Sequence, residues 1–192
     1  MFIHSVDHRW LPRFAATLAA CTISNLASAQ SYPNRFGFGN PATEKDIAAE
    51  AIGIAPDGKG LPVGKGDYYT GRKVYQQHCA ACHGEDLQGV SGLLNMGPLI
   101  GGRGTLATPN PVLTVESYWP YATTLFDYIR RAMPFTAPGS LAADEVYAVS
   151  AYILVKGGII KKSIVLDQHT LPKVKMPNRN GFVPDPRPET FQ

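Results

Sequence analysis

The chain has 192 residues, with 18 Lys and Arg against 15 Asp and Glu, so its formal net charge is +3. This length suits one domain with extra segments, and so small a basic excess argues against nucleic-acid binding, which normally shows as a basic stripe. A hydrophobic share of 44% is enough for a packed core, and three cysteines are too few for a disulfide framework. The 19 glycines and 16 prolines predict many loops between the elements.

Residues 1–29 are predicted to be an export signal. Two arginines precede a mostly apolar stretch over 14–26, and Ala27-Ser28-Ala29 matches a small-residue cleavage site. The apolar stretch is too short to cross a bilayer, which needs about 20 residues, and no transmembrane segment is expected in the mature chain. We therefore expect a periplasmic protein that begins at Gln30. An ordinary N-terminal helix and a lipid anchor on Cys21 are the alternatives.

Four helical regions follow in chain order, over 43–51, 69–81, 114–132 and about 141–156. Between them, the density of glycine and proline over 84–113 leaves no room for a long element. Within 114–132, Thr114 and Thr123 are each expected to cap a helix, because Ser and Thr are favoured at that position. Two prolines then end the second of these helices and force an extended loop around Met133.

The strongest local signal is Cys79-Ala80-Ala81-Cys82-His83, the C-x-x-C-H motif of covalent c-type haem attachment. Two thiols three residues apart on a helical turn can add to the two vinyl groups of one porphyrin, and the adjacent His83 then supplies a nitrogen ligand to the iron. The alternatives are a thioredoxin-like redox pair, which needs a βαβ context, and half of a zinc site. Zinc would need two more ligands, for which the chain after the leader offers only His78 and His169. We therefore predict one covalently bound haem c.

Met133 is the predicted sixth ligand of the iron. It lies well beyond His83, in a loop that two prolines restrict, so its thioether can be held near the iron at little entropic cost. Met96, Met176 and the two histidines are the other candidates, and a methionine at a helix end often only fills a core. An iron with both His and Met ligands has no open position for a substrate, and this ligand pair raises the reduction potential. The haem is therefore expected to carry electrons.

These motifs resemble class I cytochrome c. The run 71–83 is similar to that family's first helix and haem site, and the run 133–153 is similar to its methionine loop and closing helix. The resemblance implies an all-α fold in which the first and last helices cross, with Gly71, Tyr75 and Tyr152 at the contact.

Four further residues are candidates for binding the haem. Gly97-Pro98-Leu99 resembles the family's loop in which a proline carbonyl orients the haem histidine, a bond that also tunes the metal. Trp119 and Tyr121 are candidates for the pocket or for a haem propionate, with a purely core role as the alternative. Arg103 could pair with a propionate through charge-assisted hydrogen bonds, and a solvated loop arginine is the alternative.

A narrower resemblance covers the runs 36–43, 117–135 and 173–184. Together they are similar to the cytochrome subunit of sulfite dehydrogenases and of the related sulfur dehydrogenase in the thiosulfate-oxidising Sox system. The resemblance implies a molybdenum-cofactor subunit that oxidises the substrate and a haem subunit that passes single electrons to a downstream acceptor. Some relatives carry two haems, whereas this chain has one attachment motif. The competing hypotheses are a free electron shuttle to an oxidase and a haem enzyme acting on thiosulfate or peroxide.

The expected organisation is a signal peptide at 1–29, an N-terminal arm at 30–66, a cytochrome c haem domain at 67–157 and a C-terminal arm at 158–192. Both arms are rich in Pro and Gly. They carry apolar residues that a small domain would leave in water, namely Phe36, Phe38, Ile159, Ile160, Val165, Leu166, Phe182 and Val183. We expect the arms to bind the molybdenum subunit, and the alternative is that they wrap their own haem domain.

Overall fold

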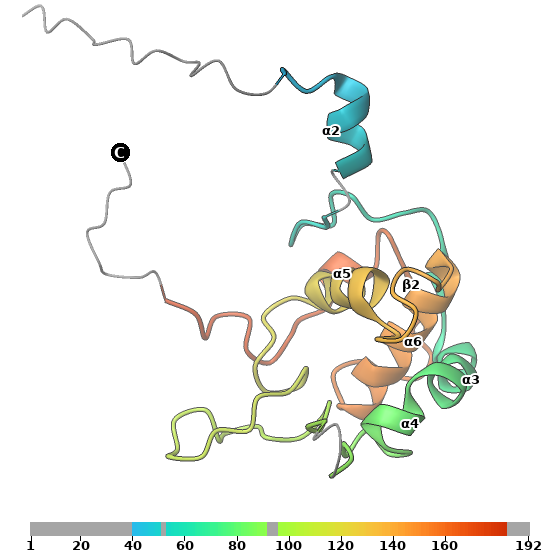
Figure 1. Ribbon diagram of the computed structural model, residues 1–192. Helices are drawn as coiled ribbons and strands as arrows, with labels where there is room; N and C mark the ends of the chain where they lie inside the picture. The colour runs from blue at the N-terminus through green and yellow to red at the C-terminus, as the bar shows by residue number, and fades with distance from the viewer. Residues whose placement is uncertain (1–39, 51–52, 92–95, 184–192) are drawn as a thin grey trace, which may run out of the picture. The chain divides into compact units, whose positions relative to one another are not determined.

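The computed structural model describes residues 40–50, 53–91 and 96–183. Its elements are helices α2 (Glu44–Glu50), α3 (Tyr68–His78), α4 (Ala80–His83), α5 (Ala122–Ala132) and α6 (Ala143–Lys156), strands β1 (Lys65–Gly66) and β2 (Leu166–Asp167), and the 3-10 helix η1 (Leu171–Lys173) (Figure 1). The only sheet among the described residues pairs β1 with β2 antiparallel, with Gly66 opposite Leu166. The predicted all-α class is therefore confirmed.

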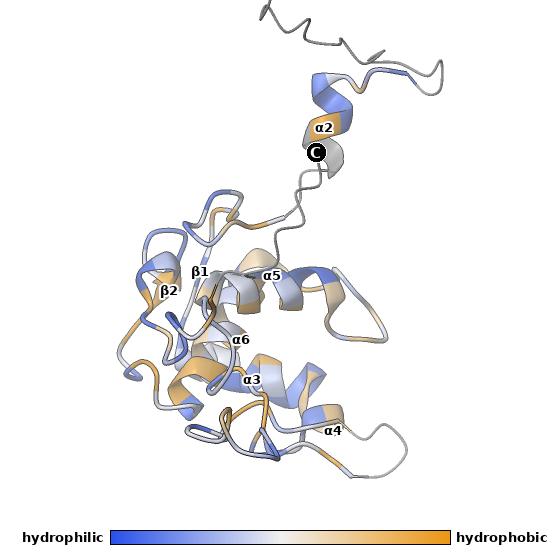
Figure 2. Ribbon diagram, turned by 90° about the vertical axis from the view of Figure 1, so that its left-hand side faces the viewer, coloured by the Kyte–Doolittle hydropathy of each residue, from blue (hydrophilic) through white to orange (hydrophobic). Residues whose placement is uncertain are grey.

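Helix α6 is the centre of the packing. It contacts α3, α5 and both strands, and Figure 2 shows it between α5 and α3. It is buried almost from end to end because its residues from Val146 to Leu154 are small, aliphatic or aromatic. The Glu145 carboxylate accepts a hydrogen bond from the Ala142 N–H at 2.8 Å, which satisfies one free donor at the helix start. The helix ends at Gly157, as the sequence predicted.

The crossing of α3 and α6 has the predicted residues at its contact. A Cβ atom on Gly71 would overlap the backbone oxygen of Ala148, so only glycine permits this approach. The rings of Tyr75 and Tyr152 lie beside it, with centroids 5.0 Å apart. Helix α3 itself begins at Asp67, whose carboxylate accepts a hydrogen bond from the Thr70 N–H at 2.8 Å.

Two predicted helix starts are wrong. The region after Thr114 is a turn, in which the Thr114 hydroxyl accepts hydrogen bonds from the N–H groups of Glu116 and Ser117 and donates one to the Gly101 carbonyl. Such side-chain bonds to the backbone compete with helix formation. Helix α5 begins after Tyr121, and the Thr123 hydroxyl donates to the Pro56 carbonyl at 3.4 Å instead of capping the helix.

Segments on both sides of the predicted haem domain pack against it. On the N-terminal side, the Lys65 N–H donates to the Asp144 carboxylate at 2.7 Å and the Tyr147 hydroxyl donates to the Pro62 carbonyl at 2.9 Å. On the C-terminal side the fully or almost fully buried residues are Leu166, Leu171 and Met176, and Ile159, Ile160 and Val174 are partly buried against the same core. For residues 53–66 and 158–176 the structure thus supports the alternative in which the arms wrap their own domain.

A few arm residues remain in solvent or outside the described residues. Val165, Phe182 and Val183 are exposed, so part of their apolar surface is available to a partner. Phe36 and Phe38 lie outside the described part of the chain. Within the described ranges, no helix has the length and hydrophobicity needed to span a bilayer.

Candidate functional site: a haem cavity

A cavity of about 460 Å³ lies among α3, α4, α5 and α6. Its walls are mostly apolar and come from five parts of the chain; they comprise Tyr75, His78, Cys79, Cys82, His83, Met96, Pro98, Leu99, Leu113, Thr114, Val115, Trp119, Leu125, Tyr128, Ile129, Met133, Pro134, Phe135, Thr136, Val149 and Ile153. None of these residues is Asp, Glu, Lys or Arg. The cavity is therefore suited to a largely apolar ligand of the size that protein pockets usually bind.

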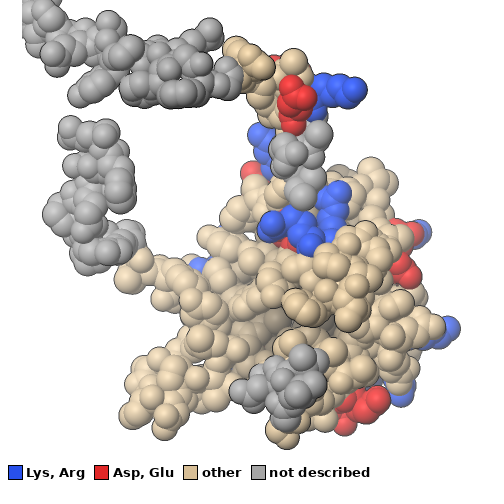
Figure 3. Space-filling model, viewed as in Figure 1, with Lys and Arg blue, Asp and Glu red and all other residues tan. Residues whose placement is uncertain are grey.

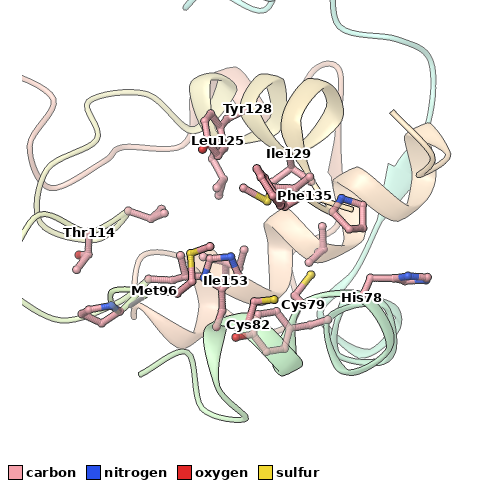
Figure 4. Close-up of a pocket in the computed structure, with 18 of the residues that line it drawn as sticks. His78, Cys79, Cys82, Met96, Thr114, Leu125, Tyr128, Ile129, Phe135 and Ile153 are labelled. Atoms are coloured by element: carbon pink, nitrogen blue, oxygen red, sulfur yellow. The ribbon is translucent and has the colours of Figure 1, made fainter. Parts of the chain in front are cut away.

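The attachment motif forms one wall because the chain turns sharply at Cys79. Helix α3 ends there with the Cys79 N–H bonded to the Tyr75 carbonyl at 2.8 Å, and the Cys79 carbonyl then accepts from the His83 N–H at 2.9 Å. The Tyr75 hydroxyl donates to the Gly84 carbonyl at 2.7 Å and secures the far end of the motif. Figure 4 shows the sulfur atoms of Cys79 and Cys82 turned toward the cavity.

Burial favours the uncharged forms of two groups in this wall, His83 and Cys79. It lowers the pKa of His83, so the imidazole is neutral and can offer a nitrogen lone pair to a metal. Burial, with the neighbouring Cys82, raises the pKa of the Cys79 thiol to about 11. Nδ1 of His83 is buried and lacks a hydrogen-bond partner among the described residues.

The opposite wall comes from the end of α5 and the loop that follows. Figure 4 shows Ile129 and Phe135 across the cavity from the two cysteines, and Met133 lies between them in sequence and lines the same cavity. Met133 is held at the helix end by its N–H, which donates to the Ile129 carbonyl at 3.0 Å. The structure thus places a histidine and a methionine in opposing walls.

The other candidate ligands are placed differently. Met96 also lines the cavity, next to the bridge that its backbone forms with Val90. Met176 is buried in the core and is not part of the cavity wall, and neither is His169. His78 lines the cavity, but its side chain is exposed. No three His, Cys, Asp or Glu side chains of the described part gather so as to hold a metal ion, and the zinc alternative finds no further ligands there.

Comparison with known proteins decides the family. The model for subunit III of cbb3-type cytochrome c oxidase matches residues 66–153. Among solved structures, a chain of the sulfane dehydrogenase SoxCD from Paracoccus pantotrophus is 38% identical with a TM-score of 0.71, and the match covers 82% of this chain and 76% of that chain. The chain belongs to the Sox-type cytochromes c. The thiosulfate dehydrogenase TsdBA from Marichromatium purpuratum is 28% identical over 46% of this chain and 17% of its own, with a TM-score of 0.34 that is too low to carry a conclusion.

The cavity of this cytochrome fits the haem c with iron that the family implies. Two nearby thiols for thioether bonds, a neutral, half-buried imidazole whose Nδ1 is buried and unpartnered, and an opposing thioether all reach one apolar space. These are the groups that attach haem c covalently and ligate its iron. The resemblance to class I cytochrome c is confirmed for the fold.

The four other candidate residues of the cytochrome divide into two pairs. Pro98 and Trp119 line the cavity. Leu99 secures the Pro98 loop, because its N–H donates to the Leu87 carbonyl at 2.9 Å and its carbonyl accepts from the Val115 N–H at 3.1 Å. No hydrogen bond joins His83 Nδ1 to the Pro98 carbonyl or to any other described group.

Arg103 and Tyr121 are not among the residues that line the cavity of the cytochrome. The Arg103 guanidinium forms an ion pair with Glu116 at 2.6 Å. It also donates a hydrogen bond to the Gly157 carbonyl, at the end of α6, at 2.6 Å. The Tyr121 ring is covered by the Arg179 guanidinium, 4.3 Å from its centroid. Both side chains therefore have protein partners outside the haem cavity.

Sequence reasoning missed three residues at the cavity mouth of the cytochrome. Leu113, Tyr128 and Phe135 line the cavity while keeping exposed surface, and we call them the rim. Tyr128 could have been found because it lies three residues after Leu125 on α5, a spacing that places two side chains on the same face of a helix. Leu113 has no such signal, because it lies in a loop that tertiary bonds alone bring to the site.

Proposed function

We propose that this cytochrome is the periplasmic electron-transfer subunit of a molybdenum-cofactor dehydrogenase that oxidises sulfite or another sulfur compound. The observation that carries the proposal is the extent of the likeness to SoxCD, which covers 82% of this chain, far more than residues 66–153. The likeness therefore includes segments that flank the haem domain. Those segments lie outside residues 66–153, the part that the family model matches, and are shared with a chain of the sulfane dehydrogenase.

The proposed roles of the site residues follow from their placement. Cys79 and Cys82 would hold one haem through thioether bonds, and His83 and Met133, which line the same cavity, would ligate its iron. The bound haem supplies one-electron oxidation and reduction. Because His83 and Met133 would both ligate the iron, no position would be left for a substrate, and oxidation of the sulfur compound is proposed to belong to the partner subunit. Pro98 and Trp119 complete the wall.

Electrons are proposed to enter or leave through the cavity mouth. The rim is exposed, with Phe135 70% accessible, and among the atoms shown in Figure 3, apart from the grey residues, no Lys, Arg, Asp or Glu borders the hollow. Salt screens charge pairs but has little effect on contacts between apolar surfaces. Reduction by the partner is therefore expected to depend weakly on ionic strength, in contrast to association steered by charge.

Purification of the cytochrome from its host, followed by metal analysis, tests the proposed complex. We expect a molybdenum-containing subunit to co-elute, and we expect the haem absorbance to change to that of the reduced form when sulfite or a sulfane compound is added. A free shuttle would elute alone without molybdenum, and a haem enzyme would consume the substrate without the second subunit. N-terminal sequencing of the periplasmic protein, expected to begin at Gln30, tests export and separates cleavage after Ala29 from a lipid anchor at Cys21.

A pair of matched variants tests the rim. Phe135→Ser removes an exposed aromatic ring from the mouth, whereas Val63→Ser changes an apolar side chain that is 85% exposed and lies outside the cavity lining. We expect Phe135→Ser to slow reduction of the haem by the partner and Val63→Ser to leave the rate unchanged. Equal rates for both variants, or a rate that falls steeply with salt, would show that electrons pass elsewhere.

A further inference from the structure

The last described segment of the chain lies across the loop that forms the cavity wall. We call residues 176–182 the C-terminal strap. Met176 anchors the strap in the core, where it is 3% exposed. Beyond this anchor, the Asn178 side-chain amide donates to the Tyr118 carbonyl at 2.6 Å, and the Phe182 ring meets the Tyr118 ring edge-on with centroids 5.2 Å apart. Figure 1 shows this segment in red beside the yellow loop that precedes α5.

The strap contacts this loop on both sides of Trp119. Asn178 and Phe182 hold residue 118, and the Arg179 guanidinium lies 4.3 Å from the centroid of the Tyr121 ring. Trp119 itself lines the cavity, with its ring edge-on to Tyr128 at a centroid distance of 5.6 Å.

The beginning of this loop is fixed by hydrogen bonds within the domain, whereas its later part, from Tyr118 to Tyr121, is held by the strap. The Tyr118 N–H donates to the Thr114 carbonyl at 3.0 Å, and the Thr114 hydroxyl donates to the Gly101 carbonyl at 2.7 Å. These bonds hold the beginning of the loop. Among the described residues, the strap supplies the hydrogen-bond and ring partners that Tyr118 and Tyr121 have outside the loop and α5. These contacts connect the residues on both sides of Trp119 to residues about 60 positions further along the chain, in addition to the packing of the indole against the core and Tyr128.

We propose that the C-terminal strap is a positioning element that holds Trp119 in the wall of the haem cavity and so raises the reduction potential of the haem. The inference rests on the proposed function, in that it takes the cavity to hold haem c. The physical reason is solvent access, which is one of the properties that set the potential of a metal centre. A loosened Trp119 wall admits water, and water favours the oxidised, more highly charged iron. Releasing the strap is therefore expected to lower the potential.

The test uses the exported holoprotein, in which Trp119 is the only tryptophan once the predicted signal peptide with Trp10 has been removed. Asn178→Ala removes the hydrogen bond to the loop without changing charge, and Arg179→Ala removes the contact with Tyr121. Arg179→Lys keeps a cation that can still lie over the ring. Lys175→Ala is the control, because Lys175 is an exposed cation near the strap that makes none of these contacts.

Two measurements are made on each variant, the reduction potential by equilibrium titration and the emission of Trp119, which the haem quenches by energy transfer. We expect Asn178→Ala and Arg179→Ala to lower the potential and increase the emission, and the double variant to do both more strongly. Arg179→Lys should have a potential and an emission close to those of the wild type, and Lys175→Ala should change neither quantity. A tenfold change in the equilibrium constant for reduction corresponds to about 59 mV, which such a titration resolves.

An unchanged potential and emission in the double variant would overturn the proposal. So would a shift that occurs only together with loss of the near-infrared band from sulfur to iron, since the whole site would then have been disturbed. If the double variant fails to fold, Phe182→Ala replaces it, because this milder change removes an exposed ring. If Phe182→Ala folds and keeps the wild-type potential and emission, the proposal is likewise overturned. Failure of the proposed function is distinguishable, because it appears in the wild type as a missing haem or a missing near-infrared band.

Discussion

Leu171→Ala tests whether the C-terminal segment belongs to the cytochrome domain itself. Leu171 is fully buried in η1, which packs against α5. The substitution removes three carbon atoms at about 0.8 kcal/mol each, which is roughly 2.4 kcal/mol before any cavity forms. With the cavity left behind, leucine-to-alanine changes in cores cost about 2–5 kcal/mol. For a domain of this size the loss corresponds to a fall of roughly 4–20 °C in the unfolding temperature.

The assay is urea unfolding of the isolated cytochrome, followed by circular dichroism and by haem absorbance and analysed by linear extrapolation. Val183→Ala is the matched control, because Val183 is 83% exposed and its truncation should change the free energy of unfolding by less than about 0.5 kcal/mol. If the segment served only a partner, Leu171→Ala would leave the isolated protein as stable as the wild type. That outcome, or equal losses in both variants, would refute the packing argument.

Four further predictions concern the site and its supports. Cys79→Ala combined with Cys82→Ala should abolish haem staining under denaturing conditions and lower the intact mass by one haem, whereas a haem that extracts freely from the wild type would contradict covalent attachment. Met133→Ala should remove the near-infrared band from sulfur to iron and lower the potential; a band that persists would assign the sixth position to Met96, which also lines the cavity. Gly71→Ala should cost about 1–3 kcal/mol, because its Cβ would overlap the Ala148 backbone, while Gly53→Ala, with open space around its Cβ, should be nearly neutral. The hydrogen bond from the Thr70 N–H lowers the pKa of Asp67 below its ordinary value of 3.8. The stabilisation from this helix cap should therefore be present above pH 3.8 and be lost as the pH falls through the lowered pKa. In acid unfolding, Asp67→Asn should lack this pH dependence.

The attachment site could be predicted from the sequence because its chemistry is local. Two thiols and an imidazole must lie within five residues to serve one porphyrin, and Cys79 to His83 meet that requirement without help from the rest of the fold. The α6 helix was equally accessible, since its apolar residues recur at helical spacing and glycine ends it. Gly71 was identified through the family resemblance, and its close approach to Ala148 bears this out.

Sequence reasoning and structure differ where a side chain has partners far away in sequence. Arg103 was a candidate for a haem propionate, with a solvated loop position as the alternative, and in the structure its guanidinium is paired with Glu116 and the Gly157 carbonyl. Thr114 has the chemistry of a helix cap and uses it in a turn joined to Gly101. Neither partner could be recognised from local pattern, because nothing near these residues in sequence distinguishes the two uses.

The sequence by itself determined the cofactor chemistry, the helical class and the family, since these depend on residue types at short, regular spacing. The tertiary structure alone decided which residues form the cavity mouth and how the flanking segments pack. Leu166 is buried because β2 pairs with β1, about 100 positions earlier in the chain. The strap likewise reaches the Trp119 loop only because Met176 is anchored in the core. The physical reason is that burial and hydrogen-bond pairing between distant segments depend on the whole packed chain, and no local pattern of residues records them.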